Sequence, residues 1–184
     1  HASGLSSPAV VIEPDGLDAA IEREPFDWHA AAPGEIRDFL RDAGVVGLGG
    51  AVFPSHLKLN PGKSGHTDTL VINGAECEPF ITCDDMLMRA EPENILRGAL
   101  IMQRMLAAKQ VLVALEDNKP EAAAALKAAA QSLGHASLEV VVVPTRYPAG
   151  GAKQLIRVLT GIEVPHGSRS TDYGVQCFNV ATAL

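Results

Sequence analysis

With 184 residues, the chain is long enough for one substantial domain, or for one domain that carries an extended arm. Its 47 % apolar content is ordinary for a globular protein, and its formal net charge of −7 argues against a nucleic-acid-binding surface. No apolar run approaches the ~20 residues of a bilayer-spanning helix, and the first residues lack the basic segment and apolar core of a signal peptide, so we expect neither.

Residues 1–33 are rich in Ser, Pro and Gly and are predicted to form an irregular N-terminal arm. The apolar run VVI at 10–12 is a short strand signal within the arm, followed by the turn composition EPDG. Isolated aromatic side chains in a polar segment usually mark docking, so we expect Phe26 and Trp28 to anchor the arm to the rest of the protein. The body of the domain is predicted over 34–184.

Apolar residues at helical spacing predict a helix over 33–43, which leads into the glycine-rich stretch GVVGLGGAVFPSHLK at 44–58. Three glycines of this stretch lie within four positions: Gly47, Gly49 and Gly50. Because these glycines lack a Cβ atom, their backbone N–H groups can approach an anion closely. Pro54 favours the first turn of a helix that follows the loop. The positive end of that helix and the Lys58 side chain would both face the anion. The stretch predicts a phosphate-bearing ligand, although a tight structural turn explains it equally well and it matches neither the Walker nor the GxGxxG spacing.

Four short apolar runs are predicted strands, at 70–72, 111–115, 140–143 and 175–180. Helical patterns lie between them, from about residue 92, over 120–133 and over 153–159, and Thr82 with the acidic residues after it predicts an N-cap box. Apolar strands that alternate with helices imply a mostly parallel sheet covered on both faces, which is an α/β architecture.

Polar and glycine residues follow each predicted strand and should gather at one edge of the sheet, where ligands bind in such folds. They are Asn73, Glu76 and Glu78 after the first, Glu116, Asp117 and Asn118 after the second, Tyr147, Gly150 and Gly151 after the third, and Asn179 and Thr182 after the fourth. The amide of Asn73 suits the edge of a heterocycle, and the two glutamates could accept hydrogen bonds from ribityl or ribose hydroxyls. Solvated surface carboxylates and an ordinary helix–strand connection are the alternatives.

Metal and nucleophile chemistry have little support in the sequence. Cys77, Cys83 and Cys177 lack the paired CxxC spacing of zinc or iron–sulfur sites, and the histidines are scattered. No Ser–His–Asp arrangement can be identified, so we predict neither a metal site nor a catalytic side chain. Reduced thiols are the expected state of the cysteines.

Six motifs in the same order resemble the RnfC component of the bacterial Rnf (Rsx) ion-translocating electron-transport complex. They are SGLSSPAVVIEPDG, AGVVGLGGAVFPSHLKL, LVINGAECEPFITCDDMLM, EDNKPEA, YPAGGAKQLIRVLTGIEVPHG and FNVAT. The core also resembles, more distantly, the NADH-oxidising flavoprotein subunit of respiratory complex I. The resemblance implies a Rossmann-like domain that holds FMN, which takes a hydride from NADH and passes electrons singly to iron–sulfur clusters.

Carried over motif by motif, the resemblance implies a set of roles. Gly47, Gly49 and Gly50 would form the flavin loop, Phe53 would lie near the nicotinamide, and Lys58 would contact flavin or nucleotide. Asn73 and Glu76 would hydrogen-bond the flavin, Glu78 would face the dinucleotide, and Tyr147, Gly150 and Gly151 would close the site. Asn179 and Thr182 match the last flavin-contacting stretch.

Three positions depart from the resembling families. Val52 stands where the family usually has glycine, so its side chain is expected to intrude where the cofactor approaches. Ala75 stands where complex I has aspartate, and Ala152 stands where complex I and many Rnf sequences have a glutamate that contacts NADH.

The resemblance also implies a longer protein, with a β-rich domain before this stretch and a domain carrying two [4Fe–4S] clusters after it. That protein would sit peripherally on the cytoplasmic side of the bacterial inner membrane, bound to the other Rnf subunits. Two alternatives are a flavin-dependent cobalamin reductase-like module and a non-catalytic assembly scaffold with a degenerate nucleotide pocket.

Overall fold

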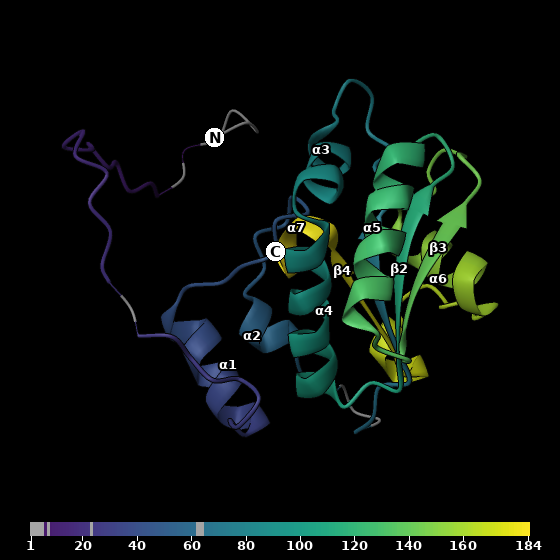
Figure 1. Ribbon diagram of the computed structural model, residues 1–184, viewed down its shortest axis with the longest axis horizontal. Helices are drawn as coiled ribbons and strands as arrows, with labels where there is room; N and C mark the ends of the chain where they lie inside the picture. The colour runs from purple at the N-terminus through teal and green to yellow at the C-terminus, as the bar shows by residue number, and fades with distance from the viewer. Residues whose placement is uncertain (1–5, 7, 23, 62–64) are drawn as a thin grey trace.

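The computed structural model describes residues 6, 8–22, 24–61 and 65–184 (Figure 1). Part of the predicted arm lies outside the described residues, namely residues 1–5, 7 and 23, and this includes part of the first motif. In chain order the elements are α1 (Pro33–Asp42), α2 (Ser55–Lys58), β1 (Thr69–Gly74), α3 (Cys83–Ala90), α4 (Pro92–Leu106), β2 (Gln110–Glu116), α5 (Pro120–Leu133), β3 (Leu138–Val143), α6 (Ala152–Thr160), a 3₁₀ turn (Ser170–Tyr173), β4 (Val175–Asn179) and α7 (Val180–Ala183).

The four strands form one parallel sheet in the order β3-β2-β1-β4. Within it Ile72 of β1 is level with Val113 of β2 on one side and with Phe178 of β4 on the other. The predicted α/β architecture is therefore confirmed. The last strand ends earlier than predicted, because Val180 already begins α7.

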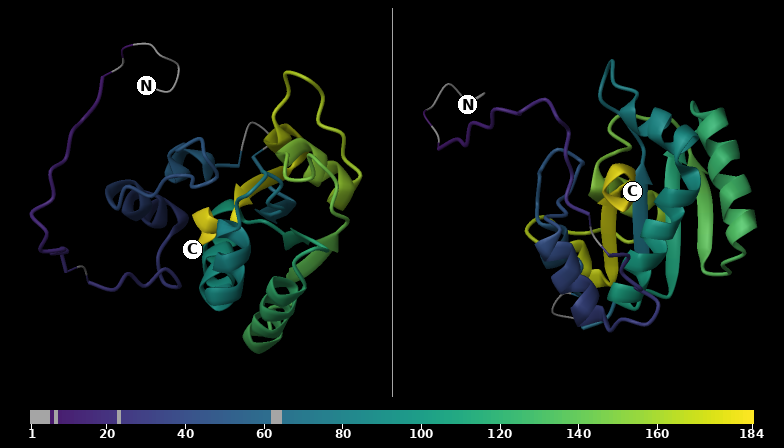
Figure 2. Two further views of the ribbon diagram at one scale, coloured as in Figure 1. Left: turned by 90° about the horizontal axis from the view of Figure 1, so that it is seen from above. Right: turned by 60° about the vertical axis from the view of Figure 1, so that its left-hand side comes forward.

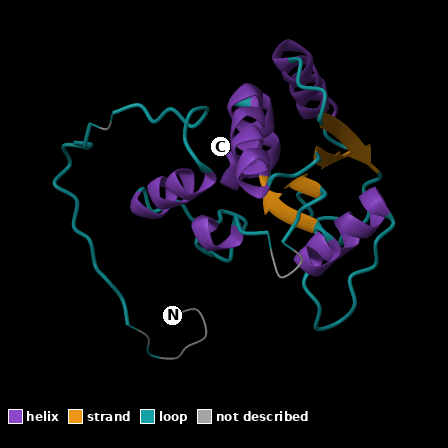
Figure 3. Cartoon of the chain, turned by 90° about the horizontal axis from the view of Figure 1, so that it is seen from below, coloured by secondary structure: helices purple, strands orange, loops and turns teal. Residues whose placement is uncertain are grey.

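Alternate strand residues face opposite layers, which gives the domain three layers. Leu70, Ile72 and Val113 join the large apolar core beneath α4 and α5, whereas Val71 and Ala114 face the second core beneath α6. Figure 2 shows α4 and α5 on one face of the sheet and α6 on the other, and Figure 3 shows the strands between the helices. The covering of both faces explains why the strands are apolar at nearly every position.

The helix boundaries follow local sequence signals. Proline occupies the first turns of α1, α4 and α5, where its missing N–H costs nothing, and Gly134 closes α5 in the left-handed conformation. At Gly98 of α4 a Cβ would overlap the backbone oxygen of Ala183, so this glycine lets α7 pack directly on α4. No helix among the described residues combines the length and apolarity that a membrane crossing requires.

The arm contains no strand in its described part, so the predicted strand at 10–12 is wrong. Val10, Val11 and Ile12 are 88 %, 92 % and 82 % exposed, and the segment extends away from the body (Figure 1). An apolar run alone does not form a strand without a neighbouring strand to bond to. The anchoring prediction is confirmed, because the Phe26 ring stacks on Phe39 with centroids 4.4 Å apart and Trp28 packs against the large core.

Candidate functional site

The strand order creates a crevice at the carboxyl end of the sheet. From β1 the chain passes through α3 and α4 to β2 on one face, and it returns to β4 through α6 on the other face. Ligands of open parallel sheets bind where the winding direction reverses, which here is the space beyond β1 and β4. A cavity of about 220 Å³ opens at this point and is called the switch-point cavity below.

Most of the predicted site residues line the switch-point cavity: Gly47, Gly49, Phe53, Lys58, Asn73, Gly150, Asn179 and Thr182. The structure also brings Ser55, Ala152 and Cys177 to it, and none of these three was predicted to bind a ligand. Gly50 and Gly151 are not among its lining residues.

The glycine-rich loop is closed by hydrogen bonds across its base. The Gly47 N–H donates to the Phe53 carbonyl at 2.8 Å, and the Ser55 N–H donates to the Val45 carbonyl at 3.0 Å. Gly50 adopts a φ of +100°, which L side chains rarely adopt, and a Cβ on Gly49 would lie 3.0 Å from the Cβ of Asn179. Glycine is thus required for conformation at Gly50 and for close packing at Gly49.

Two polar groups of α2 at the switch-point cavity form no hydrogen bond or ion pair with the described residues. The Ser55 hydroxyl is buried, and no described residue forms a hydrogen bond with it. The Lys58 ammonium lies 4.3 Å from the centroid of the Phe178 ring, and none of the described carboxylates pairs with it. Burial lowers the pKa of Lys58, and burial also raises the pKa of the neighbouring Cys177 thiol to about 11. A hydroxyl donor and an uncompensated cation favour an anionic or electron-rich ligand.

Asn73 connects β1 to the loop before α6. Its Nδ2 donates to the Gly150 carbonyl at 2.9 Å and its Oδ1 accepts from the Ala75 N–H at 3.0 Å. A Cβ at Gly150 would come within 2.9 Å of the Cys77 sulfur and still closer to the Ala75 oxygen. Gly150 is therefore needed for packing at the wall of the cavity.

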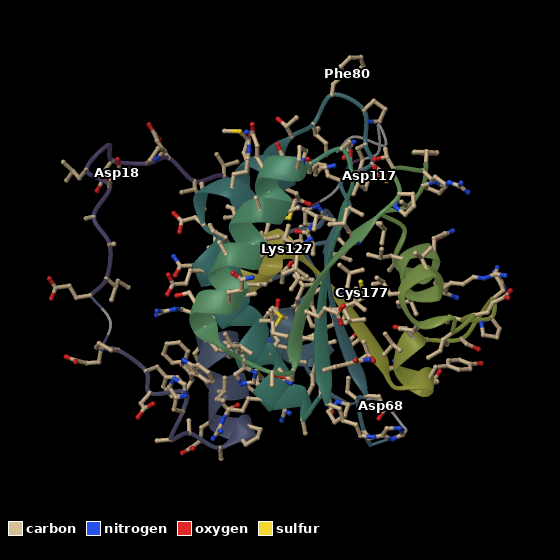
Figure 4. All side chains as sticks on the ribbon, turned by 45° about the vertical axis from the view of Figure 1, so that its right-hand side comes forward. Asp18, Asp68, Phe80, Asp117, Lys127 and Cys177 are labelled. Carbon is tan, nitrogen blue, oxygen red and sulfur yellow. The ribbon has the colours of Figure 1, made fainter. Side chains whose placement is uncertain are left out.

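Three other predicted residues, Glu76, Glu78 and Tyr147, line a second cavity of about 340 Å³ at the same end of the sheet. We call it the acidic cavity. The buried ion pair of Lys119 and Glu116, with Nζ and Oε2 3.0 Å apart, also lies there. Tyr147 is 82 % exposed, and Figure 4 shows Phe80 projecting from the adjoining loop. The structure thus divides the predicted residues between two cavities, except for Gly50 and Gly151, which line neither.

Glu76 caps helix α3, and this corrects the predicted N-cap box at Thr82. The Thr82 side chain makes no capping hydrogen bond, whereas the Glu76 carboxylate accepts from the Asp84 N–H at 3.0 Å and the Asp85 N–H at 3.4 Å. The helix begins where predicted, but its N–H groups are satisfied by a carboxylate from the preceding loop.

Within the described part of the chain, one group of side chains brings three possible metal-ligand atoms within 4.8 Å: Glu76, Cys83 and Asp84. The Cys83 thiol donates to Glu76 Oε1 at 3.2 Å, and the same carboxylate receives the N–H groups of α3. This group is accounted for as a helix cap.

The three departures differ in their placement. Val52 is 63 % exposed and does not line the switch-point cavity, so the expected intrusion of its side chain is not seen. Its φ of +50° places it in the left-handed region, where glycine is the favoured residue. Ala75 is buried in the core beneath α6, and Ala152 lines the cavity at the first turn of α6.

Residues 40–184 match the family model of the Nuo51 FMN-binding domain. The chain is 49 % identical over 183 residues to the C component of the ion-translocating oxidoreductase complex of Edwardsiella ictaluri, covering 99 % of this chain and 22 % of that protein. The corresponding protein of Erwinia tasmaniensis is 50 % identical over 186 residues, which is 100 % of this chain and 23 % of that protein. The chain thus spans about a quarter of the length of the curated relatives it matches.

Among solved structures, the NAD⁺-reducing [NiFe]-hydrogenase in its air-oxidised state contains a similar fold, with a TM-score of 0.68 and 26 % identity. The similarity covers 85 % of this chain and 30 % of that chain. The resemblance to RnfC that the motifs indicated is confirmed by these relatives.

Proposed function

This chain belongs to the family of Nuo51 FMN-binding domains, and we propose that its switch-point cavity holds FMN and that its acidic cavity receives NADH. The longer protein would be the electron-input subunit of an ion-translocating oxidoreductase complex, in keeping with the names of its relatives. When bound, FMN supplies the chemistry of accepting a hydride from a nicotinamide and releasing the electrons one at a time.

The observation that carries the proposal is the unpaired polar floor of the switch-point cavity. A buried hydroxyl without a hydrogen-bond partner and a partly buried cation without a carboxylate are unfavourable unless a ligand interacts with them. The Lys58 ammonium and the Ser55 hydroxyl can both donate to the oxygen and nitrogen acceptors of FMN. The packing of Gly49 against Asn179 and of Gly150 against Ala75 leaves no room for side chains where the backbone borders the cavity.

The cavity of about 220 Å³ is smaller than the roughly 300–1,000 Å³ of typical ligand sites, so it encloses part of the cofactor. Phe53 is half exposed at the cavity and offers an aromatic face for a second planar ring.

The acidic cavity offers a different chemistry. Glu78 is exposed and has no hydrogen-bond partner among the described residues, so its carboxylate is free to accept from the hydroxyls of a ribose. Glu76, in contrast, already accepts from the first turn of α3 and holds that helix in place. Tyr147 provides an exposed ring at the same cavity.

The whole-protein assignments are proposals as well. We propose a linker arm over 1–33 and the cofactor domain over 34–184, with two [4Fe–4S] clusters elsewhere in the longer protein. We further propose that the protein binds the other subunits of the complex at the cytoplasmic side of the bacterial inner membrane.

The test is quenching of FMN fluorescence by the purified protein, compared with the Lys58→Met and Lys127→Met variants. Lys127 is exposed on α5 (Figure 4), lines neither cavity, and serves as the matched control. Saturable quenching that K58M weakens by about 10- to 100-fold and K127M leaves unchanged is expected, because a charge-assisted hydrogen bond contributes roughly 1.5–3 kcal/mol. No saturable quenching by the unaltered protein would refute FMN binding.

The NADH half of the proposal has its own measurement. Anaerobic addition of NADH to the FMN-loaded protein should bleach the flavin absorbance. Binding of FMN without bleaching would mean that the protein binds the flavin but does not bind NADH productively. Ala152 would then be the first position to replace by glutamate, because the resembling families have a glutamate there that contacts NADH.

A further inference from the structure

Asn179, the last residue of β4, is held from two sides at the switch-point cavity. Its Oδ1 accepts from the Ala181 N–H at 2.9 Å, where α7 begins, and its Nδ2 donates to the Asp84 Oδ2 at 2.6 Å. A backbone N–H can only donate and a carboxylate can only accept, so these two contacts fix which way the amide faces. The second hydrogen on Nδ2 has no acceptor among the described residues and stays available to a ligand.

Asp84 is brought to Asn179 by the unusual cap of α3. Its own N–H donates to the buried carboxylate of Glu76 at 3.0 Å, which locks the first turn of the helix against the preceding loop. Asp84 lines neither the switch-point cavity nor the acidic cavity. The hydrogen bond to Asn179 is therefore the contact that links the Asp84 side chain to the switch-point cavity.

We propose that Asp84 is a positioning residue, which holds Asn179 so that its Nδ2 hydrogen-bonds to an acceptor atom of the flavin. The inference rests on the proposed function of the switch-point cavity. Without Asp84 the amide of Asn179 would keep only its contact to Ala181 and would no longer present a fixed donor.

The electrostatics of Asp84 support a role beyond stability. Burial raises the pKa of Asp84, and the nearby carboxylates of Glu76 and Glu78 raise it further, whereas Asn179 and Lys119 oppose the shift. The folded protein thus disfavours the charged form of Asp84. A neutral side chain that still accepts from Asn179 should therefore leave the protein as stable as before, whereas a side chain without an acceptor leaves the Asn179 Nδ2 without this partner.

The experiment compares Asp84→Ala and Asp84→Asn with Glu93→Gln, which removes a first-turn carboxylate from α4 and touches neither cavity. We expect FMN binding to weaken by about tenfold in D84A and by about threefold in D84N, and to be unchanged in E93Q, with D84N and E93Q melting at the same temperature as the unaltered protein. D84N loses less because its amide oxygen can still accept from Asn179. The NMR signals of the Asn179 side-chain amide should shift in both Asp84 variants without FMN.

A purely structural role predicts different results. It would lower the affinity of D84N for FMN only together with its melting temperature, and that outcome would overturn the inference. Unchanged FMN affinity in D84A would also overturn it, while leaving the proposed function intact. Failure of the unaltered protein to bind FMN would refute the proposed function instead, and the amide signals would then still show whether Asp84 holds Asn179.

The double variant D84N/N179D sharpens the test, because it restores a hydrogen bond between the two positions with donor and acceptor exchanged. The aspartate at 179 can still accept from the Ala181 N–H, but it presents only acceptors to the cavity. We expect the fold to be retained and FMN binding to stay at least tenfold weakened. Recovery of the affinity would overturn the claim that Asn179 acts as a donor.

Discussion

Replacement of Val52 by glycine should stabilise the protein. Val52 has a φ of +50° and is 63 % exposed, so its side chain contributes strain and little burial. A left-handed conformation costs an L-residue about 1–2 kcal/mol, and the greater freedom of glycine in the unfolded chain offsets about 0.5–1 kcal/mol of that gain. The expected net gain is about 0.5–1 kcal/mol, which raises the melting temperature of a domain of this size by about 1–4 °C.

The assay is thermal and urea unfolding of Val52→Gly beside Val158→Gly. Val158 is also 63 % exposed but lies within α6, where glycine should destabilise by roughly 0.5–1 kcal/mol. If both variants lose stability equally, the reasoning from the backbone of Val52 is wrong. FMN affinity should not change in V52G, because Val52 does not line the switch-point cavity. A large gain in affinity would favour the degenerate-pocket hypothesis.

Further predictions concern the two cores and the cavity floor. Lys58→Met should raise the melting temperature while weakening FMN binding, because burial lowers the pKa of Lys58 and the ligand-free fold disfavours its charge. The affinity for FMN should also fall as the pH rises through the lowered pKa of Lys58, because the ammonium then loses its charge. This loss of affinity should occur at a lower pH than the titration of a free lysine, and it should be absent in K58M. Gly98→Ala should destabilise by about 1–3 kcal/mol in urea unfolding, since its Cβ would displace α7 from α4. The Cys177 thiol, buried and with a pKa of about 11, should resist alkylation at pH 8 in the folded protein. Exposed Cys83 should be labelled under the same conditions, although more slowly than a free thiol, because its hydrogen bond to Glu76 raises its pKa.

The sheet could be predicted from sequence because the residues that specify each strand are close together in the chain. Each strand is a short apolar run between turn residues, and the helices carry proline at the start or glycine at the end. The run at 10–12 has the same composition but no neighbour, and strand formation depends on pairing that a local pattern does not contain.

Site residues could be predicted where a sequence motif contains them, but not where only the tertiary structure brings them to the site. Gly49 and Lys58 belong to a glycine-rich stretch that the sequence makes visible. Nothing in the sequence marks Ser55 or Asp84 in the same way, because the importance of Ser55 comes from its burial and that of Asp84 from its hydrogen bond to Asn179. The spacing of Ser55 three positions before Lys58 on a predicted helix is a signal that could have suggested a shared face. The cap of α3 by Glu76 could not be found in this way, because the N-cap position is occupied by Thr82, a residue with good capping propensity.

The adjacency of β1 and β4 has a consequence for the order of events during synthesis. Asn73 and Asn179 are neighbours across the sheet, yet the segments that supply the other two strands lie between them in the chain. The loop-closure entropy of such a distant contact makes this pairing a late step of folding. A nascent chain emerging from the ribosome can therefore bury α4 and α5 on β1 and β2 before any flavin pocket exists. Cofactor loading would then be limited by docking of the last strand.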